Sequence, residues 1–205
     1  MAGRHTWEGP AAGQRLRLPC LRVGGLPAWG GAAYTTGVKF LLVDKLLSVA
    51  EDRSSLEASK HVTLAEEYLA DHFESFPVLP GVMMLECAVQ SAAWLLHLRS
   101  GFAKSVAVLK EAKNVRYGNF VAPGDALTMT VDLLKEVDGG GATFKFAGQT
   151  GSGSQAVSGR LELSYFNLAE KDADTEAADA RLIEHHRHRW TALTSANPPA
   201  TPIDL

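Results

Sequence analysis

His72 and Glu86 stand fourteen residues apart, and their types and spacing suit acid–base chemistry. A histidine titrates near neutral pH and can take a proton from carbon, and a carboxyl group on an apolar helix can keep a proton to donate. Between them, Pro80-Gly81 is expected to begin a helix, because proline needs no hydrogen-bond donor there. The free N–H groups of Gly81 and Val82 can then stabilise negative charge on an oxygen. Removal of water from a 3-hydroxyacyl thioester requires such a base, acid and oxyanion site.

Glu86 is the less ordinary of the two residues, because it lies in a run of apolar residues. Burying a carboxylate is costly unless it is paired or neutralised, and no Lys or Arg lies within two turns of it. Glu86 therefore faces a cavity or a partner from elsewhere in the fold. Gln90, one turn later on the same face, is expected to hydrogen-bond Glu86 or the backbone. A histidine before a helix is more often a capping or surface residue, so the interpretation of His72 depends on Glu86.

The elements that position these residues follow from the pattern of apolar side chains. From residue 81 to about 98 the sequence is apolar on every face of a helix, which predicts a buried helix that other elements must wrap. Alternation of apolar and polar residues predicts the strands: 56–63, 106–109 with 113–117 as one broken strand, 127–133, 143–148 and 156–165. A short helix or strand is expected at 40–47, and a helical turn at 65–70. These elements predict an α+β fold, with an antiparallel sheet around one long helix.

Composition narrows the class of protein. The chain has 205 residues, 46% of them hydrophobic, and a net charge of -3, which gives no basic surface for nucleic acid. Its two cysteines, Cys20 and Cys87, cannot build a disulfide framework and fit a reducing, cytoplasmic compartment. The apolar run from Val82 to Leu98 is too short and too polar to predict a membrane span.

The two ends of the chain differ from the middle. Residues 1–38 are rich in Arg, Gly and Pro and are expected to form a disordered extension. Residues 39–166 are expected to form the domain, and 167–205 a C-terminal tail that is partly helical. In this tail His185, His186 and His188 are expected at a solvated helix end, although a metal site remains an alternative.

Three blocks of sequence resemble the 3-hydroxyacyl-[acyl-carrier-protein] dehydratases of the FabZ type. They occur in the same order as in that family and together cover roughly residues 39–166. The central block is His72-Phe73, Pro77, Pro80-Gly81-Val82, Glu86 and Ala88-Val89-Gln90, the upstream block is Phe40-Leu-Leu-Val-Asp-Lys45, and the downstream block is Val121-Ala-Pro-Gly-Asp-Ala-Leu127. The spacing of fourteen between His72 and Glu86 also matches the family.

The resemblance implies the hotdog fold, in which an antiparallel sheet curls around a long helix. It implies dehydration of (3R)-hydroxyacyl-[acyl-carrier-protein] to the trans-2-enoyl product in fatty acid biosynthesis, with His72 as base and Glu86 as acid. It further implies a homodimer, possibly assembled as a trimer of dimers, in which His72 of one chain faces Glu86 of the other. No metal or organic cofactor is expected, because the substrate arrives on the phosphopantetheine of acyl carrier protein. Phe73, Phe76 and Pro80 are expected to line the substrate tunnel.

The sequence departs from the family pattern beside the histidine. The family has Gly before this residue and Pro-Gly after His-Phe, whereas this chain has Asp71, Glu74 and Ser75. These changes leave two alternatives open: a non-catalytic hotdog protein that binds acyl thioesters, or a paralogous hydratase or thioesterase. The basic cluster at 185–189 is a further candidate for docking the acidic carrier protein.

Overall fold

The computed structural model describes residues 40–70, 72–73 and 75–195. The predicted extension at 1–38 lies outside these residues, as do the last ten residues of the chain. All of the described residues belong to one unit, which begins at Phe40.

A long helix, α1 (Gly81–Arg99), runs through the middle of this unit. Pro80 precedes its first turn, as predicted, and neither glycine nor proline interrupts it before Ser100. The helix ends where Gly101 takes a φ of 62° and the Phe102 N–H donates to the His97 carbonyl at 2.7 Å. Most of its residues are buried, so the predicted core helix at 81–98 is confirmed.

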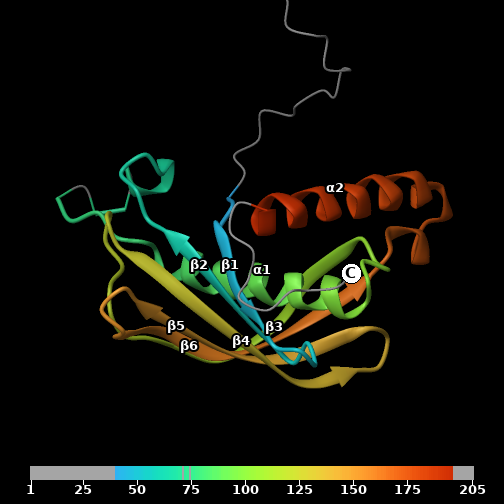
Figure 1. The fold of residues 1–205 in the computed structure, drawn as a ribbon, viewed down its shortest axis with the longest axis horizontal. Coiled ribbons are helices and arrows are strands. Elements are labelled where there is room, and N and C mark those ends of the chain that lie inside the picture. The colour runs from blue at the N-terminus through green and yellow to red at the C-terminus, as the bar shows by residue number, and fades with distance from the viewer. Residues whose placement is uncertain (1–39, 71, 74, 196–205) are drawn as a thin grey trace, which may run out of the picture. The chain divides into compact units, whose positions relative to one another are not determined.

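Six antiparallel strands form one sheet that curls around α1 (Figure 1). Their order across the sheet is β1-β2-β4-β5-β6-β3, so β1 and β3 are its two edges. The strands are β1 (Lys45–Val49), β2 (Ser55–His61), β3 (Val106–Tyr117), β4 (Ala126–Val137), β5 (Gly141–Thr150) and β6 (Gln155–Phe166). Alternate side chains of β4, β5 and β6 point into the core against α1. This is the hotdog fold, and the predicted α+β architecture is confirmed.

Two strands differ from the sequence pattern in instructive ways. β3 is one strand whose register against β6 shifts after Leu109 and again after Lys113, which accounts for the break in its alternation. Asn114, at the second shift, has a φ of 53°. The apolar segment 40–47 enters the sheet only at Lys45, because its earlier part is held by α1 instead.

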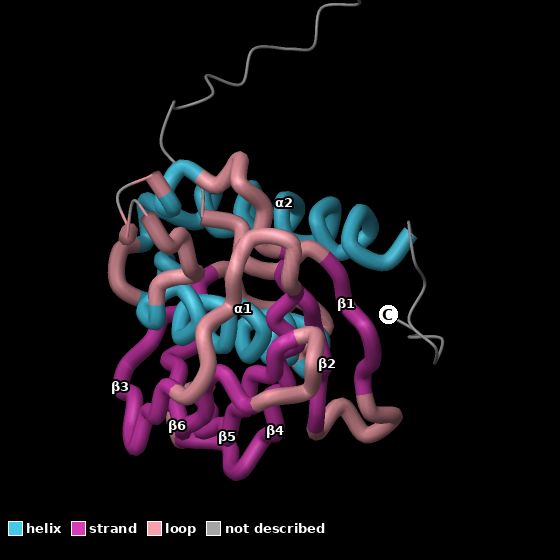
Figure 2. Tube along the Cα trace, turned by 90° about the vertical axis from the view of Figure 1, so that its left-hand side faces the viewer, coloured by secondary structure: helices cyan, strands magenta, loops and turns pink. Residues whose placement is uncertain are grey.

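A second helix, α2 (Glu176–Ser195), follows the sheet through two short 3-10 turns, η2 (Leu168–Glu170) and η3 (Ala173–Thr175). It lies over α1 on the side away from the sheet (Figure 2). Trp190 of α2 is buried, and its ring centroid lies 6.0 Å from that of Trp94 of α1. Thus part of the predicted tail covers the face of α1 that the sheet leaves open.

Among the described residues, α1 is the one helix whose length and composition alone would allow it to cross a membrane. However, 61% of its most apolar stretch is buried inside the fold. The sheet and α2 thus cover most of the surface that a lipid-facing helix would expose, as they do for the core helix of a globular domain.

Candidate active site

Glu86 sits near the start of α1, half-buried, with one partner for its carboxylate. The side-chain amide of Gln90 donates to Glu86 Oε1 at 3.0 Å. The prediction that Gln90 bonds Glu86 or the backbone is confirmed on both counts, because the same amide nitrogen donates to the Phe40 carbonyl at 2.9 Å. No cation forms an ion pair with Glu86 in the described part of the chain.

The orientation of the Gln90 amide is fixed by the segment that leads into β1. Leu42 N–H donates to Gln90 Oε1 at 3.0 Å, so the amide nitrogen must point to the other side, toward Phe40 and Glu86. Cys87 fastens the same segment, because its thiol donates to the Leu42 carbonyl at 3.0 Å. The Phe40–Lys45 block is therefore the part of the fold that positions Gln90 and, through it, Glu86.

The start of α1 has the properties expected of an oxyanion site. Met83 N–H and Met84 N–H both reach the Pro80 carbonyl, at 2.9 and 3.2 Å. Among the described residues neither Gly81 N–H nor Val82 N–H has an acceptor. The two positions assigned to charge stabilisation are therefore the two with free donors at the positive end of the helix.

Gly81 is also required by packing. A Cβ at this position would lie 3.0–3.3 Å from three atoms of the Tyr117 ring. Tyr117 is the last residue of β3, so the edge of the sheet closes against the first turn of α1. A larger residue at position 81 would push that ring away from the helix start.

His72 lies in the loop between η1 (Glu67–Leu69) and α1. Its ring packs on that of Phe73, with 4.3 Å between the centroids. Phe73 has a φ of 59°, a left-handed conformation that is costly for a bulky residue. Phe76 N–H donates to the Phe73 carbonyl at 2.8 Å and closes a tight turn. The residue that follows His72 is therefore one of the strained backbone positions of the fold.

The downstream block, Val121–Leu127, ties these segments together. The Val121 carbonyl accepts from Leu79 N–H at 2.8 Å, just before α1 begins. Val62 N–H donates to the Asp125 carbonyl at 3.0 Å, just after β2 ends. The downstream block therefore joins the segment after β2 to the segment that leads into α1.

The chain brings Glu86, Gln90 and the helix start together, but within the described residues no hydrogen bond or ion pair joins His72 to Glu86. The residues expected to line a tunnel have different surroundings. Pro80 is buried, whereas Phe73 and Phe76 are exposed. The Phe76 ring meets the exposed Phe120 edge-on, with 5.8 Å between centroids. Phe76 and Phe120 thus form an exposed aromatic pair at the loop that holds His72.

A buried polar cluster at the other end of α1 has no counterpart in the sequence analysis. His97 lies 4.4 Å, ring to ring, from His186 of α2, and its Nδ1 is 3.0 Å from the Tyr165 hydroxyl. Burial, followed by the nearby His186, lowers the pKa of His97 from 6.5 to about 3. The expectation of a solvated cluster at 185–189 is thus wrong for His186, whose ring faces α1, although His185 and His188 are exposed.

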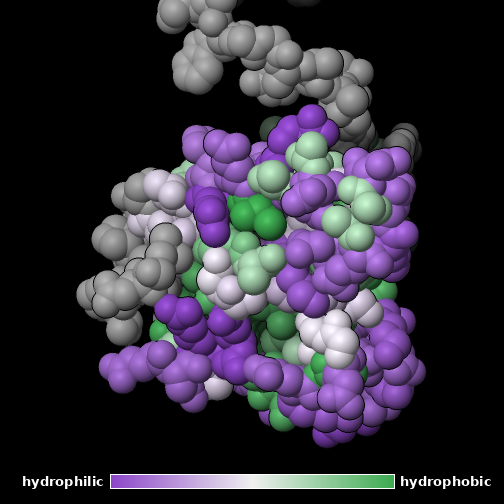
Figure 3. Space-filling view, turned by 90° about the vertical axis from the view of Figure 1, so that its right-hand side faces the viewer, coloured by the Kyte–Doolittle hydropathy of each residue, from purple (hydrophilic) through white to green (hydrophobic). Residues whose placement is uncertain are grey.

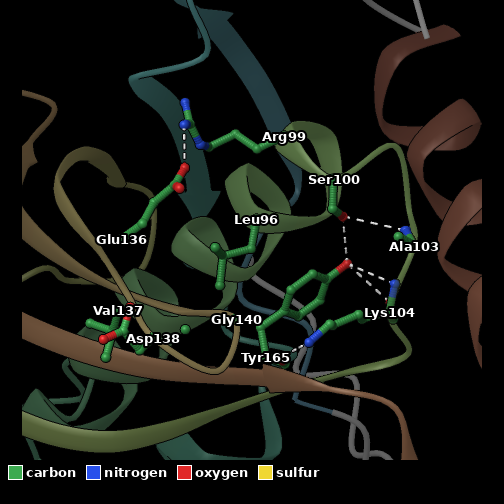
Figure 4. A pocket seen from close by; sticks show the side chains of 11 residues that line it. Leu96, Arg99, Ser100, Ala103, Lys104, Glu136, Val137, Asp138, Gly140 and Tyr165 are labelled. Atoms are coloured by element: carbon green, nitrogen blue, oxygen red, sulfur yellow. Dashed lines mark hydrogen bonds and ion pairs between the residues drawn. The ribbon is translucent and has the colours of Figure 1, made fainter.

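A hollow of about 420 Å³ lies near this cluster, at the C-terminal end of α1. Arg99 and Glu136 form an ion pair of 2.5 Å on one side of it, and the Tyr165 hydroxyl bonds Ser100 and the Lys104 backbone on another (Figure 4). The surface at this end of the molecule is mostly hydrophilic (Figure 3). Leu96, which lines the hollow, lies ten residues beyond Glu86, about 15 Å along the helix. The hollow is therefore separate from the predicted site.

No group of three or more His, Cys, Asp or Glu side chains suited to a metal ion occurs among the described residues.

The chain is similar to known proteins in family profile, in sequence and in fold. A profile of the FabA-like domain matches residues 36–159. The 3-hydroxyacyl-[acyl-carrier-protein] dehydratase FabZ of Chlamydia trachomatis serovar L2 is 37% identical over 136 residues, which are 65% of this chain and 86% of the relative. FabZ of Chlamydia abortus is 35% identical over 137 residues, 66% of this chain and 86% of the relative. Among solved structures, the dehydratase heterocomplex ApeI:P of Xenorhabdus doucetiae has a TM-score of 0.54 at 17% identity, covering 67% of this chain and 90% of that chain. The structural likeness shows the fold.

Proposed function

Because the chain belongs to the FabA-like family and is similar to its FabZ members over most of the domain, we propose that it dehydrates (3R)-hydroxyacyl-[acyl-carrier-protein] in fatty acid biosynthesis. The observation that carries the proposal is the arrangement at the start of α1. There a carboxylate held by Gln90 follows, about one turn along the same helix, two N–H groups that have no acceptor among the described residues. This is the helix that the family resemblance assigns to the site.

Each group has one role in this proposal. His72 takes the proton from C2, and the N–H groups of Gly81 and Val82 stabilise the negative charge that develops on the thioester oxygen. Glu86 gives its proton to the C3 hydroxyl, which leaves as water while the C2–C3 double bond forms. The proton held by His72 and the one lost by Glu86 are then exchanged through solvent, so the enzyme returns to its starting state.

We assign the active unit to a homodimer that shares its sites between chains. Support comes from β3, an edge strand of twelve residues that exposes Val108, Leu109 and Tyr117. A long edge with exposed apolar side chains is a template for pairing with another chain. Such pairing places a second copy beside Tyr117 and Gly81. It can also supply the partner that His72 and Glu86 do not find in each other within one chain.

The remaining assignments follow from the same activity. The substrate is carried by acyl carrier protein, so the chemistry needs no organic cofactor or metal of its own. We place the protein in the cytoplasm, where the buried Cys87 thiol stays reduced.

The test is a turnover assay with purified protein and 3-hydroxyacyl carrier-protein thioesters of several chain lengths. The conjugated enoyl thioester is followed by its absorbance. His72→Ala and Glu86→Gln are each expected to lower kcat at least about 100-fold. The exposed Glu184 provides a matched control for the carboxylate, since Glu184→Gln should leave kcat unchanged. Absence of turnover by the unaltered chain at every length would favour a non-catalytic acyl-thioester binder.

Shared sites have a test of their own. His72→Ala and Glu86→Gln chains are mixed, dissociated and allowed to reassociate. In a mixed dimer with shared sites, one site receives both substitutions and the other receives neither. Activity should therefore return to as much as half of the unaltered level per mixed dimer. Sites contained within one chain would give no recovery.

A further inference from the structure

Lys60 is a buried cation near the end of β2. It is 5% exposed. Its Nζ lies 2.7 Å from Glu66 Oε1 and 3.3 Å from Asp44 Oδ1. Burying an ammonium group is expensive, and its ion pairs offset the cost only when their geometry is good. A hydrophobic residue would fill this place without that cost, so the ion network points to a role beyond packing.

The charges around Lys60 keep it protonated. Burial alone would lower the pKa of Lys60, but the hydrogen bond with Glu66 and the charges of Asp44 and Glu66 outweigh burial and hold this pKa above its ordinary value. The ammonium group is therefore a permanent charge at neutral pH. It draws together two carboxylates from two separate segments of the chain.

Asp44 connects this charge to the segment that positions the acid. Its Oδ2 accepts from His61 N–H at 2.8 Å, and its own N–H donates to the Ser59 carbonyl at 2.9 Å. Two residues earlier, Leu42 is bound to α1 through Gln90 and Cys87. Thus Asp44 belongs to a segment whose position relative to Glu86 is already fixed.

Glu66 connects the same charge to the segment that carries the base. It is the N-cap residue immediately before η1, and its carbonyl accepts from Leu69 N–H at 3.1 Å. Leu69 is buried and ends η1, three residues before His72. Movement of Glu66 would therefore move the start of the loop that holds His72.

We propose that Lys60 is a positioning residue for His72, acting as a buried brace that holds the His72 loop, through Glu66, against the Asp44 segment. This inference rests on the proposed function, since it assumes that His72 acts on the substrate. Lys60 touches neither His72 nor Glu86. It acts by fixing the place from which the base approaches the helix start.

The experiment compares Glu66→Gln and Lys60→Met with the unaltered full-length chain. Both variants are expected to lower kcat by about 10- to 100-fold, because small displacements of a catalytic group have effects of this size. KM should change less than about twofold, because neither residue is placed at the substrate. Hydrogen–deuterium exchange should become faster over residues 62–70 and stay unchanged in α1 and β5.

Two further variants separate bracing from general stability. Lys60→Arg keeps a cation between both carboxylates and should restore kcat to within about threefold of the unaltered chain. Glu136→Gln removes the ion pair with Arg99 by the same substitution as Glu66→Gln, far from the His72 loop. It should change neither kcat nor exchange at 62–70. If Lys60→Met does not fold, Glu66→Gln still tests the brace, because the Glu66 side chain is more exposed than that of Lys60 and its substitution disturbs folding less.

Hydrogen–deuterium exchange does not depend on turnover. It therefore tests the brace at Lys60 independently of the proposed dehydratase activity. Exchange that is unchanged at 62–70 in Glu66→Gln, or faster to the same extent throughout the fold, would overturn the brace. So would a fall in kcat that matches the loss of folded protein. If the unaltered chain is inactive but exchange at 62–70 is faster in Glu66→Gln, the proposed dehydratase activity would be overturned. The role of Lys60 in holding residues 62–70 would then remain, without a catalytic consequence.

Discussion

Gln90 and Glu86 are joined by a hydrogen bond of 3.0 Å whose direction is set by the backbone of another segment. Because Leu42 N–H occupies the Gln90 oxygen, the amide nitrogen always faces Glu86. Glu86 Oε1 is thereby engaged, and Oε2 is the oxygen available for proton transfer. Glu86, the acid of the proposed reaction, is thus oriented by the segment before β1 as well as by its own helix α1.

Replacement of Gln90 by Leu should therefore weaken both the site and the fold. The change removes the partners of Leu42 N–H and the Phe40 carbonyl together with that of Glu86. Leu42 is buried, so leaving its N–H without a partner costs about 1–3 kcal/mol, whereas the exposed Phe40 carbonyl can bond water. We expect a lower thermal midpoint and a kcat reduced at least about tenfold, measured by calorimetry and turnover. Gln149→Leu, on the exposed face of β5, serves as control. Equal effects in both variants would contradict the assigned role.

The contact between Gly81 and Tyr117 predicts a pair of substitutions that compensate. Gly81→Ala places a methyl group against the ring and should destabilise the protein by about 1–3 kcal/mol through overpacking. Tyr117→Leu makes room for this group. The double variant should therefore be more stable than the sum of the two single changes indicates. Chemical denaturation of all four proteins measures the coupling, and additive effects would show that the ring does not press on the helix start.

His97 predicts loss of stability in mild acid. Its pKa in the folded state, about 3, lies below the unfolded value of 6.5, so the unfolded chain binds a proton more readily. The stability that the neutral ring contributes is complete above pH 6.5 and is lost as the pH falls toward 3. Between pH 7 and pH 5 the loss from this group is about 2 kcal/mol. His186, whose pKa burial also lowers, acts in the same direction.

Thermal unfolding at pH 7 and pH 5 checks this expectation, with His97→Gln as the comparison. The glutamine side chain of this variant can still hydrogen-bond the Tyr165 hydroxyl, but it does not titrate in this range. Its thermal midpoint should depend less on pH than that of the unaltered chain. An equal slope in both proteins would show that acid instability arises elsewhere.

Phe73 predicts opposite effects on stability and turnover. Asn adopts the left-handed conformation more readily than Phe, and Phe73 is 58% exposed, so Phe73→Asn should leave stability unchanged or raise it by about 1 kcal/mol. Loss of the ring that packs on His72 should lower kcat by about 3- to 10-fold. Chemical denaturation measures the free energy of unfolding of Phe73→Asn, and a turnover assay on the same preparation measures its kcat. A fall in stability with unchanged kcat would contradict this assignment.

Much of the site could be predicted because its parts are local in sequence. Glu86 and Gln90 share one helix face, and the apolar residues on every side of that helix indicated that it is buried. The break in β3 was visible as lost alternation between Leu109 and Lys113. The start of α1 was indicated by Pro80.

The rest depends on contacts that no periodicity reveals. His97 meets His186 because α2 lies over α1, and a helical pattern in the tail does not say which face it turns inward. Lys60 lies on the same side of β2 as the buried Leu56 and Ala58, but alternation does not say which carboxylates meet its charge. Its partners come from the segment before η1 and from the segment before β1. Long-range ion networks of this kind leave no pattern in a single sequence.

The brace at Lys60 has a consequence for a dimer with shared sites. Each chain would give its His72 to one active centre and its Glu86 to the other. The path from Gln90 through the Asp44 segment and Lys60 to Glu66 would then run between two centres rather than within one. Substrate that displaces the His72 loop in one centre would also displace Glu86 of the same chain in the other centre. The two centres would be mechanically coupled, and binding at the first would alter the second.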